Sequence, residues 1–493
     1  MRRYQKRILY SLAFLVVVYL LLLIPGRKDQ EIVAATYQPF RWSVDSFWNK
    51  LEADFVAAKQ LDPVSVSKKT DSLLHSSETL CVSIESNTIP ATSNLYDSLL
   101  NEFFVLAPLV ATRPEYIDRF NGLYSRIKTA IKHQSQTWDM NKLSSRKRLY
   151  KNLYGMRAAV EEVALQQKTD SIVSLIKGKD EPSATPSTEI FGIKVHSGDM
   201  LVSRGGAEVS AFISRGNDYP GNFSHVALIY VDEQTKTPYL IEAHIEKGVA
   251  IATVDQYIKD KKLRCMVLRP RADLPQLKAD PLLPQKAAKF AYMQATARHI
   301  PYDFKMNFYD SSALFCSEVA SYAYKKNRLI LWKAVSTISS PGIENWLHAF
   351  GVEHFVTQMP SDLEYDPQLT VVAEWKDNET LLKDHIYNAV MDGLITEADK
   401  GTEITFPRWQ LPFARLLKAY CVVMNRFGKV AIIPEGMSAE QALKNQSFVS
   451  MFQTVKQAVE KDVQQFIQQK QYNPPYWQMV KMAEEHAKEY CEH

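Results

Sequence analysis

The chain lacks the residue patterns that build metal sites and disulfide frameworks. It has five cysteines in 493 residues, and no two of them form a C-x-x-C pair, which disfavours structural zinc and dithiol redox chemistry. The eleven histidines are dispersed and no H-E-x-x-H motif occurs, which argues against a zinc hydrolase. We therefore expect no metal and no cofactor. The odd number of widely spaced cysteines is also unlike a disulfide scaffold and leaves room for one reactive thiol.

An excess of charge of one sign is also missing. There are 59 basic and 55 acidic residues, for a formal net charge of +4, and this balance gives no reason to expect a nucleic-acid partner. Internal repeats and low-complexity tracts are absent. With 46% hydrophobic residues, the chain is long enough for about three globular domains.

One long apolar run, from Ile8 to Pro25, lies near the N-terminus. Four basic residues precede it: Arg2, Arg3, Lys6 and Arg7. Eighteen helical residues span about 27 Å, close to the hydrocarbon thickness of a bilayer. This pattern predicts a transmembrane anchor within residues 1–30, with the basic end in the cytoplasm and the rest of the chain on the periplasmic side of the inner membrane. A cleaved signal peptide and a buried helix of a soluble protein are the alternatives.

Hydrophobic periodicity divides the remaining chain. Segments such as Lys142–Gln167 repeat apolar residues every three or four positions, as amphipathic helices do, whereas runs such as Val226–Val231 are short and β-rich. Ser438 and Gln441 fit a capping box at the start of a late helix. We predict an α+β fold, a small antiparallel sheet with packed helices between two helical regions. The expected units are a helical region, a linker, the α+β domain and a second helical region, at residues 40–176, 177–190, 191–345 and 351–493.

Cys316 is the candidate nucleophile. Apolar residues recur after it at helical spacing and turn-like residues precede it, so it should occupy the first turn of a helix. Unpaired backbone N–H groups and the helix dipole at that position would lower the pKa of the thiol. The same N–H groups can bind an oxyanion. The alternative is a buried structural cysteine, which this segment alone favours.

His225 and Glu242 are the candidate partners of that thiol. His225 follows a Gly-Asn turn and opens a predicted strand, and Glu242 lies near the end of the next strand. A carboxylate on the neighbouring strand can fix the tautomer of an imidazole and stabilise its charged form. His244 projects to the same face as Glu242, because side chains alternate along a strand, and spacing does not choose between them. A strand-edge histidine and a solvent-facing carboxylate are the alternatives.

Four short motifs occur in a fixed order. They are a G-D-M-L strand within Ser197–Gly205, S-H-V-A at Ser224–Ala227, I-E-A at Ile241–Ala243 followed by Gly248 and Val249, and P-Y-D at Pro301–Asp303 before F-C-S-E at Phe315–Glu318. In this order they resemble the circularly permuted papain-like NlpC/P60 cysteine hydrolases of the YiiX/YebB-like family, which are related to the lecithin–retinol acyltransferase-like proteins. The resemblance covers Phe191 to Trp332.

The resemblance implies a role for each residue of the candidate site. It implies that Cys316 is the nucleophile, His225 the general base and Glu242 the residue that orients the base, with His244 as a possible third residue. Tyr302 and Asp303 are expected near the cleft, as candidate cleft-lining residues; a core aromatic and a turn residue are the alternatives. Asp199 is expected to be structural.

Three functions are compatible with these residues. The first is an extracytoplasmic hydrolase that cleaves amide bonds in cell-wall peptides through an acyl-enzyme. The second is a lipid-directed acyl hydrolase or acyltransferase held near its substrate by the anchor. The third is a binding module that keeps the fold without catalysis. The expected partners are accordingly a peptide, a peptidoglycan fragment or a lipid, together with the membrane.

Overall fold

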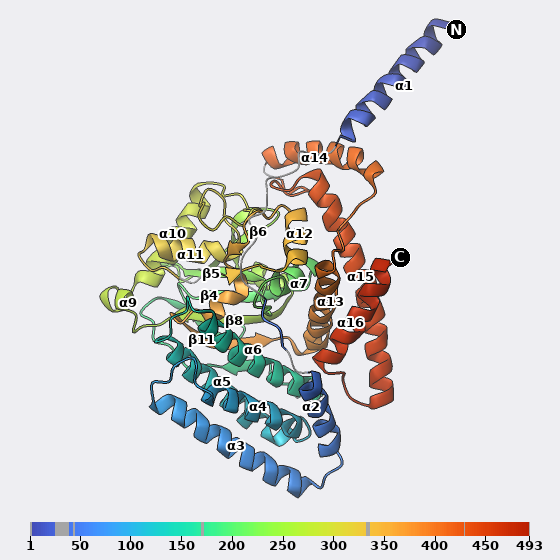
Figure 1. Ribbon diagram of the computed structural model, residues 1–493. Coiled ribbons are helices and arrows are strands. Elements are labelled where there is room, and N and C mark those ends of the chain that lie inside the picture. Colours follow the sequence, from blue (N-terminus) through green and yellow to red (C-terminus); the bar gives the residue numbers. More distant parts are fainter. Residues whose placement is uncertain are drawn as a thin grey trace.

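The computed structural model describes residues 2–24, 39–42, 45–168, 172–331, 336–427 and 429–492. Around a central sheet it places helices from both ends of the chain (Figure 1). The first helices are α1 to α6, at Arg2–Leu22, Asp45–Ala58, Pro63–Ser86, Leu95–Ala111, Ile117–Ser135 and Leu143–Leu165. The last are α12 to α16, at Pro341–Ala349, Leu381–Asp399, Leu411–Arg426, Ala439–Lys470 and Tyr476–Glu492. The capping box of Ser438 and Gln441 is confirmed at the start of α15.

The sheet has seven strands in the order β1-β11-β8-β4-β5-β6-β7, and each neighbouring pair is antiparallel. In this spatial order the strands are Leu175–Lys177, Leu369–Lys376, Lys262–Pro270, Met200–Gly205, His225–Val231, Pro238–His244 and Gly248–Thr253. Two short hairpins accompany it, formed by Ser187–Ile190 (β2) with Ile193–His196 (β3) and by Ser336–Thr337 (β9) with Val356–Thr357 (β10). The expected α+β class with a small antiparallel sheet is therefore present.

Both faces of the central strands are covered, which explains why β5 is apolar along nearly its whole length. Val226 and Leu228 pack in one core with α10 (Leu283–Ala297) and α11 (Cys316–Lys326), whereas Ala227 and Ile229 pack in a second core. The smaller helices α7, α8 and α9 lie at Glu208–Arg215, Val254–Lys259 and Pro275–Ala279. Tyr257 of α8 belongs to the second core.

The sheet is wider than the region expected to form it. Strand β11 pairs with β8 and strand β1 pairs with β11, although the hydrophobic pattern assigns residues 369–376 to a helical region.

A network of buried charges also joins the helices to the sheet. Arg264 of β8 forms ion pairs with Glu161 of α6 and Asp384 of α13. Ion pairs between residues so far apart in sequence cannot be recognised from local hydrophobic periodicity.

The N-terminal helix corrects one prediction. Among the described residues, none of the helices combines the length and the apolar character needed to cross a membrane. The physical reason is that α1 begins in the basic segment and ends at Leu22. Its apolar part from Ile8 onward spans only about 22 Å, less than the ~30 Å hydrocarbon core. Residues 25–30 of the expected anchor lie outside the described residues.

Candidate active site

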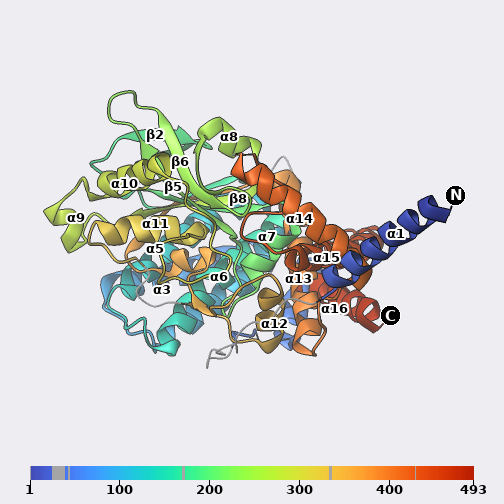
Figure 2. The same ribbon diagram turned by 90° about the horizontal axis from the view of Figure 1, so that it is seen from above.

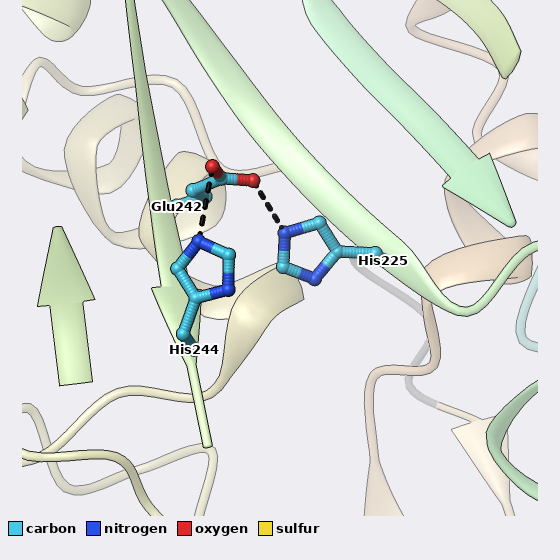
Figure 3. A group of neighbouring side chains, drawn as sticks. All are labelled: His225, Glu242 and His244. Carbon is cyan, nitrogen blue, oxygen red and sulfur yellow. Dashed lines mark hydrogen bonds and ion pairs between the residues drawn. The ribbon is translucent and has the colours of Figure 1, made fainter. Parts of the chain in front are cut away.

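Two neighbouring strands bring three polar side chains together at one end of the sheet. Glu242 of β6 lies opposite Ala227 of β5, and because side chains alternate, His225, Glu242 and His244 all project from the same face. The Nε2 atom of His225 is 2.7 Å from one carboxylate oxygen of Glu242, and the Nε2 atom of His244 is 3.0 Å from the other (Figure 3). One buried carboxylate therefore holds both imidazole rings.

These contacts set the charge state of the group. Burial alone would raise the pKa of Glu242, but the hydrogen bonds from His225 and His244 and their charges hold the pKa well below its usual range. Burial also lowers the pKa of His225, although Glu242 opposes this effect. Glu242 is thus a carboxylate, and His225 is neutral near pH 7. With Nε2 of His225 directed at Glu242, its Nδ1 is left as the proton acceptor.

Cys316 is the first residue of α11, as the sequence predicts. Its side chain packs inward, and the residue is only 5% exposed. The sulfur lies 3.9 Å from the carbonyl oxygen of Ser224, the residue directly before His225. The thiol thus contacts the backbone of the residue next to His225. Within the part of the chain that the structure describes, no hydrogen bond between Cys316 and His225 is recorded.

The expected low pKa of the thiol is wrong for this structure. Burial raises the pKa of Cys316 to about 12, although the backbone N–H groups of Val226, Ser317 and Cys316 itself lower it. The helix start does supply N–H groups at the sulfur, as predicted, but the removal of water outweighs them. Cys316 is therefore a neutral thiol that needs a base.

Comparison with known proteins places this site in a family. Residues 194–373 match the family model described as permuted papain-like amidase enzymes, YaeF/YiiX, C92 family. The matched segment, which we call the C92 domain, is the part of the chain that is similar to this family. The protein is accordingly a cysteine hydrolase of the papain-like kind, and the resemblance drawn from the short motifs is confirmed. Neither a curated protein nor a solved structure matches the chain.

The matched segment agrees with the extent of the sheet. It begins in β3 and ends in β11, so the C92 domain includes the strand that follows the catalytic-type motifs by about fifty residues. Only β1 and β7 lie at the edges of the sheet, and β11 is an interior strand. Strand β1, which pairs with β11 at the edge of the sheet, lies before the matched segment in the sequence.

The two expected cleft residues have different positions in the C92 domain. Tyr302 bridges to Leu314, and burial raises its pKa, to which nearness to Cys316 adds. The carboxylate of Asp303 instead accepts hydrogen bonds from the backbone N–H groups of Lys305 and Asn307. Tyr302 thus lies beside the thiol, whereas Asp303 shapes the turn. Asp199 is structural, as expected, because it forms an ion pair with Arg269.

Two buried polar residues near the site, Ser203 and Glu318, were not identified as site residues from the sequence. Ser203 of β4 lies opposite His225, so its buried side chain projects from the same face of the sheet. Glu318 caps the start of α11 by accepting a hydrogen bond from the N–H group of Phe315. Burial raises the pKa of Glu318 to about 9. Glu318 belongs to the F-C-S-E motif, so its presence was visible, but its buried and protonated state was not.

The same three polar residues are the described group best suited to hold a metal ion. One ligand atom from each of His225, Glu242 and His244 lies within 4.8 Å of the others. Each oxygen of Glu242 already faces one ring, so the group is hydrogen-bonded without an ion. Binding a metal would engage the imidazole that a thiol hydrolase needs as its base.

Proposed function

We propose that the C92 domain cleaves amide bonds through an acyl-enzyme on Cys316, with His225 as general base and Glu242 as the residue that orients it. The observation that carries this proposal is the Glu242 carboxylate, which fixes Nε2 of His225 and leaves Nδ1 as the proton acceptor of a residue that directly follows Ser224, whose carbonyl oxygen contacts the Cys316 sulfur. A neutral imidazole oriented by a carboxylate is the arrangement that activates a nucleophile in triad enzymes.

The proposed reaction starts from a neutral pair. His225 takes the proton of the Cys316 thiol while the sulfur forms a bond to the carbonyl carbon, and the carbonyl π electrons move to the oxygen. Backbone N–H groups at the start of α11 stabilise that oxyanion. The carbon–nitrogen bond then breaks as His225 returns the proton to the leaving amine. Water, deprotonated by His225, attacks the thioester and releases the acid and the thiol.

The raised pKa of Cys316 supports a concerted role for the base. A thiol with a pKa of about 12 is almost entirely protonated at neutral pH, so nucleophilicity depends on proton transfer during attack. Because no hydrogen bond joins Cys316 to His225 in the described structure, a rotation of either side chain must precede this transfer. Such contacts often tighten when substrate binds.

We propose cell-wall peptides outside the cytoplasm as the substrate, with an acyl group of a membrane lipid as the alternative. The amidase description of the family supports an amide as the reacting bond. We propose the location outside the cytoplasm from the N-terminal sequence alone, in which basic residues precede an apolar run as they do in exported proteins.

The test uses the full chain and three proteins: wild type, Cys316→Ala and Cys81→Ala. Cys81 is equally buried but belongs to α3, in the helical core away from the sheet. Each protein is incubated with peptidoglycan fragments and, separately, with phospholipids and N-acylated lipids, and the products are weighed by mass spectrometry. We expect new amine and acid products from peptidoglycan with wild type and Cys81→Ala alone.

A covalent readout separates catalysis from mere binding. A slowly hydrolysed acyl donor should add its acyl mass to the peptide that contains Cys316. Products from lipids only would replace the cell-wall substrate with the alternative. Turnover that persists in Cys316→Ala, or substrate bound without any acyl adduct, would contradict the proposed mechanism.

A further inference from the structure

Helix α14, Leu411–Arg426, is apolar on two opposite sides. Its inner side packs on α15 and the segment before it, through Leu411, Ala414 and Cys421. Its outer side carries a second stripe, which we call the α14 face, formed by Trp409, Phe413, Leu416, Tyr420, Val423 and Phe427. The spacing of three and four residues places all six on one line along the helix. Each is more than half exposed.

An apolar helix face of this size is unfavourable when it is exposed to water. Helices that are apolar all round are normally buried in a core or in a membrane, and contiguous exposed apolar patches mark interaction surfaces. The segment after the helix extends the patch, because Val430 and Ile432 are exposed as well, Ile432 to 81%. The α14 face therefore calls for a partner that removes it from water.

The charges around the α14 face are of one sign. Between Glu403 and Glu435 the sequence has no acidic residue, but it has five basic ones: Arg408, Arg415, Lys418, Arg426 and Lys429. A second copy of the chain seated on this face would bring these like charges together, which is unfavourable. An anionic lipid surface accepts both the apolar stripe and the basic residues.

Helix α1 is continuous with the α14 face. The ring of Tyr19 contacts that of Phe413 edge-on, with 6.4 Å between centroids, and Arg415 donates a hydrogen bond of 2.6 Å to the carbonyl oxygen of Leu22. Figures 1 and 2 show α1 extending away from the body, next to α14. The side chains of α1 from Ile8 to Leu21 are largely exposed and apolar. The two helices thus present one joint apolar surface.

We infer that the α14 face is a docking surface for the headgroup region of a bilayer that contains anionic lipids. In this arrangement α14 lies in the plane of the surface, as amphipathic interfacial helices do. Tryptophan and tyrosine, both present on the face, suit the boundary between headgroups and acyl chains. The exposed basic residues Arg408, Arg426 and Lys429 contact lipid phosphates, whereas Arg415 and Lys418 already donate hydrogen bonds to backbone carbonyl groups.

The docking surface is coupled to the candidate active site through one aromatic residue. Phe304 packs against Cys421, Ile433 and Met437 behind the α14 face. Its ring also lies edge-on to that of Tyr302, with 5.1 Å between centroids, and Tyr302 is the residue beside Cys316. Docking would therefore hold the thiol close to the lipid surface. The docking itself does not depend on the proposed function.

Vesicle flotation with the full chain tests the inference. The probes are vesicles of phosphatidylcholine alone and of phosphatidylcholine with one third phosphatidylglycerol. The variant Phe413→Glu/Tyr420→Glu alters only exposed side chains. Leu61→Glu/Val64→Glu is the matched control, because it makes the same exposed apolar-to-acidic change at the start of α3. Circular dichroism and thermal unfolding confirm that each protein is folded.

We expect wild type and control to float with the anionic vesicles, more weakly with neutral ones and at high salt. The α14 variant should bind roughly 100-fold more weakly, since two exposed aromatic side chains that would enter the bilayer are replaced by charges. The emission of Trp409 should shift to the blue on binding, and the shift should be missing in Trp409→Phe. Equal binding of variant and wild type, which would assign binding to α1, overturns the inference. Equal binding to neutral and anionic vesicles, or a dimer in solution that Phe413→Glu/Tyr420→Glu abolishes, overturns it as well.

Discussion

Two histidine–glutamate pairs in this protein have nearly the same geometry and different surroundings. His225 and Glu242 are 2.7 Å apart at an end of the sheet, and His385 and Glu161 are 3.0 Å apart between α13 and α6. The side chain of His225 is 19% exposed, whereas that of His385 is 6% exposed. The first pair lies next to Ser224, whose carbonyl oxygen contacts the Cys316 thiol. The second has a buried Nδ1 without a hydrogen-bond partner.

The charges behind the two pairs differ as well. Glu161 also binds Arg264, so its charge is shared with a guanidinium and has a structural use. Glu242 is flanked by two histidines and by no arginine among its recorded partners in the described chain. A histidine–carboxylate contact therefore does not identify an active site by itself. Greater exposure and a cysteine beside the neighbouring backbone distinguish the His225 pair, since His385 also has a ring nitrogen without a partner.

The strongest test of this comparison removes each histidine in turn. We expect His225→Ala to lower kcat/KM by about 10³-fold or more, because the neutral thiol loses its base, with little change in unfolding free energy. His385→Ala should leave kcat per folded molecule within about twofold. Activity assays and urea titration of both variants provide the measurement, and a comparable loss of kcat in His385→Ala would erase the distinction.

The two carboxylates should differ in what they support. Glu161→Ala leaves a buried arginine with one acidic partner fewer and should lower the free energy of unfolding by about 3–5 kcal/mol. Glu242→Gln keeps the shape but removes the charge, so we expect about a 10²-fold loss of kcat/KM and a smaller loss of stability. Urea unfolding and initial rates on both variants decide this. If the loss of kcat/KM in each variant matches its loss of unfolding free energy, both carboxylates are structural.

His244 is the more exposed of the two histidines that contact Glu242 and should have a smaller effect. It contacts Glu242 but opens no strand next to the thiol. We expect His244→Ala to lower kcat/KM by roughly two- to tenfold, through a less firmly held carboxylate, and His244→Gln to restore part of that loss. A loss of kcat/KM in His244→Ala as large as that in His225→Ala would contradict the assignment of His225 as the general base.

The smallest expected effect is a shift in pH dependence. His225 must be neutral to act as base, and burial lowers its pKa, so kcat/KM should fall only as the pH drops below about 6.5, the ordinary histidine value. Glu242 raises the pKa of His225 against this effect. The acid limb should therefore move to still lower pH in Glu242→Gln. A limb at or above pH 6.5, or a shift to higher pH in the variant, would contradict the assignment.

Much of the site could be predicted because its parts are local. Strand alternation places Glu242 and His244 on one face, and a helix start places Cys316 at a first turn. The state of the thiol could not be predicted, because it depends on how much water the packed core excludes. The sequence signal for a low pKa was real, but burial has the opposite and larger effect.

The fold was predictable only where contacts are short in sequence. The antiparallel hairpin of β5 and β6 follows from two adjacent β-rich runs. Strand β11 is separated from its partner β8 by about a hundred residues, and neither run specifies the other. The ion pairs of Arg157 with Glu364 and Glu374 connect α6 to residues more than two hundred positions away. Charged residues in amphipathic helices are normally assigned to solvent, so local patterns miss such pairs.

The buried charges near β8 also set an order of events during synthesis. Arg204 and Arg264 belong to the strands that surround the site; both pair with Asp384, and Arg264 pairs with Glu161 as well. Asp384 leaves the ribosome some seconds after Cys316, at ordinary translation rates. Until then the guanidinium group of Arg204 cannot enter the core without a large desolvation cost. The strands around the site therefore reach their fully paired, buried state only when most of the chain has been completed.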